Sequence, residues 1–142
     1  MTKDHDWIAY LTGQWHLHRE ITDHRQQQTG RLIGTARFIV SGDHAMDWQE
    51  NGRLIMGDHN GEAWQRYRLC RTANGDTQIL FPDGRRFFDL PAGQTTLTMH
   101  HNCAPDRYDG MVSVQDIDHW QLQWRVQGPR KDYAMVSHYK RV

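Results

Sequence analysis

The sequence has little cysteine, no long hydrophobic run and no excess charge of either sign. Its two cysteines, Cys70 and Cys103, are too few for a disulfide framework. No apolar run approaches the roughly 20 residues of a membrane helix, and the N-terminal segment lacks the apolar core of a signal peptide. Seventeen basic residues balance seventeen acidic ones, which disfavours nonspecific binding to nucleic acid or anionic membranes. We therefore expect a cytoplasmic protein with neither nucleic acid nor a membrane as partner.

Aromatic residues are plentiful, although the mean hydropathy is only −0.86. Six Trp, five Tyr and four Phe are spread along the chain and supply core material that disordered segments lack. A chain of 142 residues can bury such a core without disulfides or metals. We predict a single domain spanning residues 1–142.

Apolar and polar residues alternate with a period of two along most of the chain. The clearest case is residues 120–127, where Trp120, Leu122, Trp124 and Val126 alternate with polar side chains. After the turn at Gly128 a second strand returns, and this alternation is typical of half-buried antiparallel strands. Further strands are expected at about 15–22, 32–40, 46–56, 62–73, 77–81, 87–90, 95–102 and 108–114.

The ends of these elements are marked by capping and turn residues. Asp4 or Asp6 is expected to cap a short helix near residues 7–11 that Gly13 terminates. Asn74-Gly75 and Asp83-Gly84 are hairpin signals. Nine or ten short strands at this spacing predict an all-β barrel or sandwich. The returning hairpin at the end of the chain favours a meander that closes on itself, and we predict a closed antiparallel barrel with a short N-terminal helix.

Two features at the chain's ends resemble the lipocalin-like (calycin) superfamily. Gly13-Gln14-Trp15 follows the predicted helix and opens the first strand, and Arg141 ends the last strand. The resemblance implies that Trp15 packs at the base of the barrel under the side chain of Arg141. A cation over an indole stabilises such a base without contacting a ligand, so we interpret this pair as structural.

Four segments resemble the bacterial family catalogued as domain of unknown function 6314. They are residues 48–52, 81–87, 101–110 and 124–133, and the resemblance implies a lipocalin-like barrel with no assigned reaction. In that family a His often follows the Phe of the Asp-Gly-Arg-x-Phe segment, whereas Phe88 stands here. A mechanism that depends on that His is therefore not expected.

A candidate acid–base site lies around residues 101–108. Leu97 and Met99 define the inner face of their strand, so His101 points inward, and Tyr108 follows on the inner face after the turn. Asp106 is placed to accept a hydrogen bond from His101 and fix its tautomer. Two interpretations fit: a general acid–base site, or a hydrogen-bond network that closes the barrel end.

Glu50 shares the parity of the inward Trp48 and needs a partner, because burial of an unpaired carboxylate is costly. Arg19 and Arg85 are the candidate partners. Such a pair either keeps a polar pocket or holds the strands in register. Arg85 alternatively binds a carboxylate or phosphate on a ligand, or remains solvated.

Reactive groups at the barrel rim also have two interpretations each. Lys131 is a nucleophile or base only if it is desolvated, and otherwise a solvated turn lysine. Cys103 shares the parity of His101 and is either a stabilised thiolate or a small buried hydrophobe.

The sequence has ten histidines, which raises the question of a metal site. His16 and His18 lie on the strand face opposite to that of Trp15 and therefore face solvent, and the spacing of the remaining histidines assigns no third metal ligand. We expect neither a metal nor a cofactor.

The function predicted first is that of a barrel that holds a small, partly apolar ligand with a polar or anionic group. The alternatives are a cofactor-free isomerase, cyclase, lyase or hydrolase that uses His101, Asp106 and Tyr108, and a haem-binding barrel with His101 as ligand. A monomer or homodimer is expected. The predicted ligand-binding residues are Trp48, Glu50, Tyr67, Arg85, Phe87, Cys103, Trp124, Lys131 and Tyr133.

Overall fold

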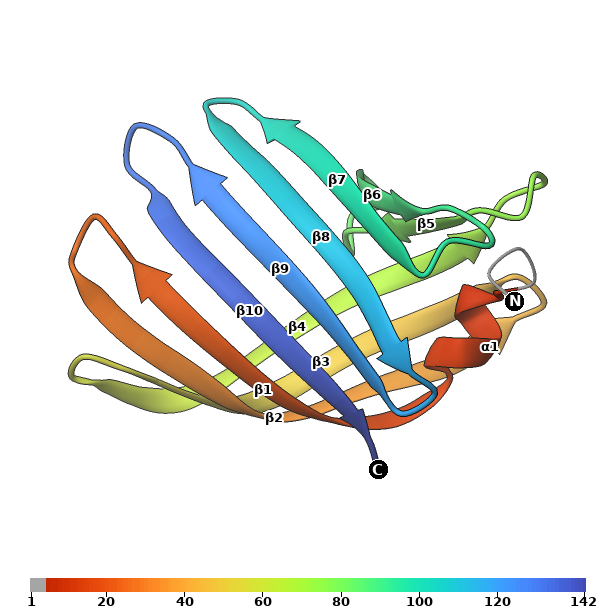
Figure 1. Ribbon diagram of the computed structural model, residues 1–142, viewed down its shortest axis with the longest axis horizontal. Helices are drawn as coiled ribbons and strands as arrows, with labels where there is room; N and C mark the ends of the chain where they lie inside the picture. Colours follow the sequence, from red (N-terminus) through yellow and green to blue (C-terminus); the bar gives the residue numbers. More distant parts are fainter. Residues whose placement is uncertain (1–4) are drawn as a thin grey trace.

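The computed structural model describes residues 5–142, which form one helix and a single antiparallel sheet that curls into a nearly closed barrel (Figure 1). The prediction of an all-β barrel with a short N-terminal helix is confirmed. The elements are α1 (Trp7–Leu11), β1 (Gly13–Asp23), β2 (Gln28–Gly42), β3 (Ala45–Met56), β4 (His59–Arg71), β5 (Thr77–Leu80), β6 (Arg86–Leu90), β7 (Thr96–Cys103), β8 (Asp106–Asp116), β9 (His119–Gln127) and β10 (Asp132–Arg141).

The strand order is β6-β5-β4-β3-β2-β1-β10-β9-β8-β7, so the last strand pairs with the first. That ladder runs from Trp15 opposite Arg141 to Asp23 opposite Tyr133. The sheet has two edges, β6 and β7, and no ladder joins them within residues 5–142. The barrel is therefore nearly closed rather than closed. The edge strand β6 spans only five residues, and its ladder with β5 has a register shift between Ile79 and Leu80.

The helix begins at a side-chain cap and packs against the base of the barrel. Asp6 Oδ1 accepts hydrogen bonds from the backbone N–H groups of Ile8 and Ala9, at 3.0 and 3.3 Å. The other predicted cap, Asp4, lies outside the described residues. Three helical side chains are buried, namely those of Trp7, Tyr10 and Leu11. No helix within residues 5–142 has the length and hydropathy that a membrane crossing requires.

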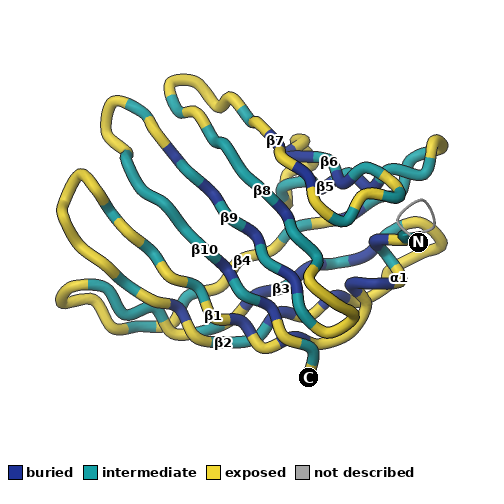
Figure 2. The backbone as a smooth tube through the Cα atoms, viewed as in Figure 1, coloured by how far each residue is buried: buried dark blue, intermediate teal, exposed yellow. Residues whose placement is uncertain are grey.

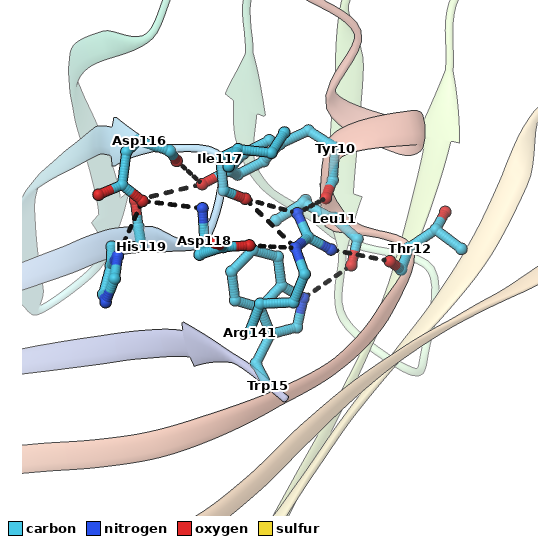
Figure 3. Close-up of polar contacts among 9 residues, drawn as sticks. All are labelled: Tyr10, Leu11, Thr12, Trp15, Asp116, Ile117, Asp118, His119 and Arg141. Atoms are coloured by element: carbon cyan, nitrogen blue, oxygen red, sulfur yellow. Dashed lines mark hydrogen bonds and ion pairs between the residues drawn. The ribbon is translucent and has the colours of Figure 1, made fainter.

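Arg141 and Trp15 close the base as the superfamily resemblance implied (Figure 3). The guanidinium lies 4.2 Å from the centroid of the Trp15 ring. Its Nη2 donates to the backbone carbonyls of Tyr10 and Ile117, at 2.9 and 2.8 Å. Trp15 Nε1 donates to the Leu11 carbonyl at 2.8 Å, so helix, first strand and last strand are joined at one place.

The buried positions follow the predicted period of two and gather toward the α1 end of the barrel (Figure 2). In β9, Trp120, Leu122, Trp124 and Val126 are buried and the intervening residues are not. The turns at the opposite end of the barrel are exposed (Figure 2). The half of the barrel away from α1 therefore has the less filled interior.

Candidate functional site

A cavity of about 280 Å³ lies inside the barrel, between the packed base and the exposed turns. Most of the strands contribute an inward side chain to it, as the alternation of apolar and polar residues requires. The lining residues are Arg19, Trp48, Glu50, Gln65, Tyr67, Phe81, Phe87, Tyr108, Leu122, Trp124, Tyr133, Met135 and Ser137.

One side of the cavity is a continuous series of aromatic rings, here called the aromatic wall: Trp48, Tyr67, Phe87 and Trp124. The ring centroids of Phe87 and Trp124 are 5.0 Å apart with an interplanar angle of 12°, and Tyr67 stacks on Phe87 at 5.7 Å. Trp48 follows at 4.8 Å from Tyr67. Rings packed on one another in this way give this side of the cavity an apolar, aromatic lining.

A β-bulge in the edge strand β6 completes this wall. Ile79 pairs with Phe88 and Leu80 pairs with Arg86, which leaves Phe87 as an extra residue. Phe87 and Phe88 are successive residues, yet both are buried, at 8% and 6% exposure. In a regular strand they would point to opposite faces. Phe88 is thus an apolar core residue in this chain.

The polar end of the cavity is built around Glu50, which is only 3% exposed. Its Oε1 accepts from Arg19 Nη2 at 2.7 Å, and its Oε2 accepts from Trp48 Nε1 at 3.0 Å and from the Tyr139 hydroxyl at 2.5 Å. Arg19 Nε also donates to Ser137 Oγ at 2.7 Å. Of the two predicted partners for Glu50, the structure selects Arg19. We call these five residues the polar cluster.

The phenols in and around the cavity are held protonated. Burial is the main cause that raises the pKa of Tyr67 to about 12 and that of Tyr133 to about 12. Burial, reinforced by the charge of Glu50, raises the pKa of Tyr139 well above its usual value. Burial alone would lower the pKa of Arg19, but the interactions with Tyr139 and Glu50 raise it. At neutral pH these groups therefore act as hydrogen-bond donors.

The three residues of the predicted acid–base site do not come together at the cavity. Tyr108 lines it, whereas His101 and Asp106 do not. The His101 ring packs against Phe87 and Tyr108, with centroids 5.4 and 5.8 Å away. Asp106 Oδ2 lies 3.1 Å from Lys131 Nζ, and no hydrogen bond joins Asp106 to His101 within residues 5–142.

The predicted rim residues lie outside the cavity. The hydrogen bond from Lys131 to Asp106 is the main cause that raises the pKa of the lysine, so it remains a cation. Arg85 Nε pairs with Asp83 Oδ2 at 2.7 Å, and its guanidinium lies 5.1 Å from the Phe81 ring centroid. Cys103 is exposed. No group of three or more His, Cys, Asp or Glu within residues 5–142 could hold a metal ion.

Besides Arg19, which was expected only as a partner of Glu50, five lining residues were absent from the predicted ligand site. Most of them share the parity of a neighbour that was predicted, so alternation carried the signal. They are Gln65 two residues from Tyr67, Leu122 two residues from Trp124, Met135 and Ser137 beyond Tyr133, and Phe81 directly after β5.

Comparison with known proteins agrees with this architecture. Residues 11–141 match the family described as "Family of unknown function (DUF6314)". No curated protein sequence matches the chain.

Solved structures share the fold at low sequence identity. The S-type phycobiliprotein lyase CPES from Guillardia theta is 12% identical, with a TM-score of 0.65 over 99% of this chain and 95% of that one. A protein of unknown function from the DUF3598 family of Nostoc punctiforme is 11% identical, with a TM-score of 0.58 over 95% of this chain and 49% of that one. A de novo designed fluorescence-activating β-barrel is 11% identical, with a TM-score of 0.52 over 97% and 99% of the two chains. At these identities the likeness shows the fold alone.

Proposed function

Because this chain belongs to the DUF6314 family, which brings no assigned reaction, we propose a function from its own cavity. The protein binds a small, flat, largely apolar molecule that carries a polar or anionic group. The observation that carries the proposal is an aromatic-lined cavity of about 280 Å³ with a polar cluster at one end.

The aromatic wall supports a flat ligand. Its rings bury apolar surface and stack on a conjugated partner with little loss of side-chain freedom. The cavity lies near the lower limit of small-molecule pockets, which begin at roughly 300 Å³, so a ligand of about two fused rings fits it better than a large one.

Binding is favoured over acid–base catalysis by the positions and ionisation of the polar groups. A general base works best with a pKa near the working pH and within reach of the substrate. Tyr67 and Tyr133 have a pKa of about 12, and His101 does not line the cavity. The same position of His101 argues against the haem alternative, because an axial ligand must face the bound group. The fluorescence-activating barrel among the similar structures supports the suitability of this architecture for a small molecule.

N-phenyl-1-naphthylamine, whose emission rises in apolar surroundings, provides a direct test. We expect saturable fluorescence enhancement with the intact protein. Trp124→Ala, which removes part of the aromatic wall, should lower the affinity for the probe about tenfold or more. Met135→Trp, which fills the cavity, should have the same effect.

Trp64→Ala is the matched control. Trp64 lies on β4 but is 70% exposed on the outside of the barrel, so this variant should bind the probe like the parent protein. Thermal unfolding monitored by circular dichroism confirms that each variant is folded. Saturable binding that survives both Met135→Trp and Trp124→Ala, or no binding by the folded parent protein, would refute the proposal.

A further inference from the structure

The acceptor capacity of the polar cluster is largely used within the protein. The Glu50 carboxylate accepts three hydrogen bonds, from Arg19, Trp48 and Tyr139. A carboxylate has about four lone-pair sites, so little of it remains for a ligand. The Glu50 carboxylate therefore offers little to a ligand that donates hydrogen bonds.

Donor capacity, in contrast, remains unused. Arg19 donates through Nε and Nη2, while its Nη1 has no hydrogen-bond partner within residues 5–142. Ser137 Oγ accepts from Arg19, and the Tyr67 hydroxyl accepts from Gln65 Nε2, so the proton of each hydroxyl is free to be donated. All three side chains line the cavity. The polar group of a ligand is thus met by donors.

The same end of the cavity carries no net charge. Among the described residues, Arg19 and Glu50 are the only charged ones that line it, and Arg19 Nη2 lies 2.7 Å from Glu50 Oε1. The rim cation Lys131 is paired with Asp106. A ligand carboxylate beside Arg19 would also lie close to Glu50, and repulsion between two carboxylates is strong where water is excluded.

We propose that the ligand's polar group is a neutral carbonyl, as in an aromatic ketone, lactone or amide, and that Arg19, Ser137 and Tyr67 are its donors. The inference rests on the proposed function and narrows the class of ligand. It excludes ligands with a carboxylate group, which an interior arginine without a partner would attract. Donors in excess select an acceptor, and the balanced charge of Arg19 and Glu50 selects an uncharged one.

Displacement of N-phenyl-1-naphthylamine by three probes of one ring system tests this. The probes are naphthalene, methyl 2-naphthyl ketone and naphthalene-2-carboxylate. One or two added hydrogen bonds should make the ketone bind about fivefold more tightly than naphthalene. Repulsion from Glu50 should make the carboxylate bind about tenfold more weakly than the ketone.

Two sets of variants separate the contributions of donors and charge. Tyr67→Phe combined with Ser137→Ala should remove most of the advantage of the ketone over naphthalene, measured as the ratio of the two affinities in each protein. Glu50→Gln, nearly the same size, leaves the Arg19 charge unbalanced. It should raise the affinity for the carboxylate about tenfold relative to that for the ketone. Thermal melting followed by circular dichroism checks that each variant is folded. If Glu50→Gln is not folded, the double variant Tyr67→Phe with Ser137→Ala decides the question.

The result that overturns the inference is tightest binding of the carboxylate by the parent protein, or a ketone that binds no better than naphthalene. Either result leaves the binding function standing. Failure of all the probes, naphthalene included, would instead count against the proposed function itself, so the two failures are distinguishable.

Discussion

Arg19 and Glu50 lie in the barrel interior, where neither charge is stable without the other. Their side chains are 15% and 4% exposed, so most of the water around each charge is removed. Removal of one partner leaves the other buried and unpaired, which costs about 3–5 kcal/mol for fully buried pairs. Arg19→Ala should therefore lower the free energy of unfolding by about 3 kcal/mol, measured by urea denaturation.

An exposed pair gives the control. Arg85 and Asp83 form an ion pair whose side chains are 66% and 56% exposed, and solvent-exposed pairs contribute little to stability. Arg85→Ala should be nearly neutral. The double variant Arg19→Met with Glu50→Gln should recover much of the loss, because it removes both charges. Equal losses for Arg19→Ala and Arg85→Ala would contradict this account.

The raised tyrosine pKa values predict how stability changes at alkaline pH. Burial raises the pKa of Tyr67 to about 12, whereas tyrosine in an unfolded chain titrates near 10. Between about pH 10 and 12 the unfolded state releases a proton that the folded state retains, so the free energy of unfolding falls as pH rises.

Denaturation with urea at several pH values measures this decline. The decline should be shallower in Tyr67→Phe, which has no phenol to titrate, than in the parent protein. Parallel pH profiles for the two proteins would show that the Tyr67 hydroxyl is not protected by the fold.

The sequence was sufficient to predict which side chains point into the barrel, but not which side chains of neighbouring hairpins contact each other. The period of two placed Trp48, Glu50 and Trp124 inside, and the structure confirms these positions. Asp106 was expected to accept a hydrogen bond from His101, but it forms an ion pair with Lys131. The reason is that β8 pairs with β9, which places the start of β8 against the turn before β10. That proximity depends on how two hairpins lie side by side, which local alternation does not specify.

At the scale of elements, Gly34 on β2 lies directly opposite Gly52 on β3, and the backbone of β3 leaves no room for a side chain at Gly34. A Cβ atom on Gly34 would lie 1.9 Å from the Asn51 carbonyl oxygen and 2.5 Å from Gly52 Cα. These are backbone atoms, which cannot move aside as a flexible side chain can. Gly34→Ala should therefore lower the free energy of unfolding by about 1–3 kcal/mol, the usual cost of overpacking, in chemical denaturation.

Gly42, on the same strand, serves as the comparison. A Cβ atom there would have its nearest neighbour at 3.9 Å, an ordinary van der Waals contact. Gly42→Ala should change stability by less than about 0.5 kcal/mol. If both variants are equally stable, the close approach of β2 to β3 is not a constraint on the fold.

The bulge in β6 shows the limit of prediction from sequence at the scale of an element. The segment near residues 87–90 was correctly predicted as a strand, and Phe87 as a cavity residue. Alternation places Phe88 on the opposite face, yet it is buried beside Phe87. The extra residue is visible only in the register between β5 and β6, since a bulge is a property of two paired strands.

For the molecule as a whole, alternation and turn residues predicted a barrel of the observed strand content but not the gap between β6 and β7. Edge strands lack a second partner for their backbone groups and open more readily than central strands. Amide hydrogen exchange should therefore be faster in β6 and β7 than in β1 and β10, which are interior strands paired on both sides. Uniform protection across these four strands would mean that the barrel closes in solution.

The gap also divides the chain into two parts that are each continuous in sequence. Every ladder joins strands that are neighbours along the chain, except the one between β1 and β10. A cut in the Pro91–Thr95 connection would interrupt no ladder, and it would leave fragments carrying β1 to β6 and β7 to β10. Co-expressed, these fragments should assemble through the β1–β10 ladder and the shared core into a barrel that binds the same probes. The protein is in this sense two meanders joined by one long-range ladder, and its topology provides a site at which the chain can be divided without loss of a strand pairing.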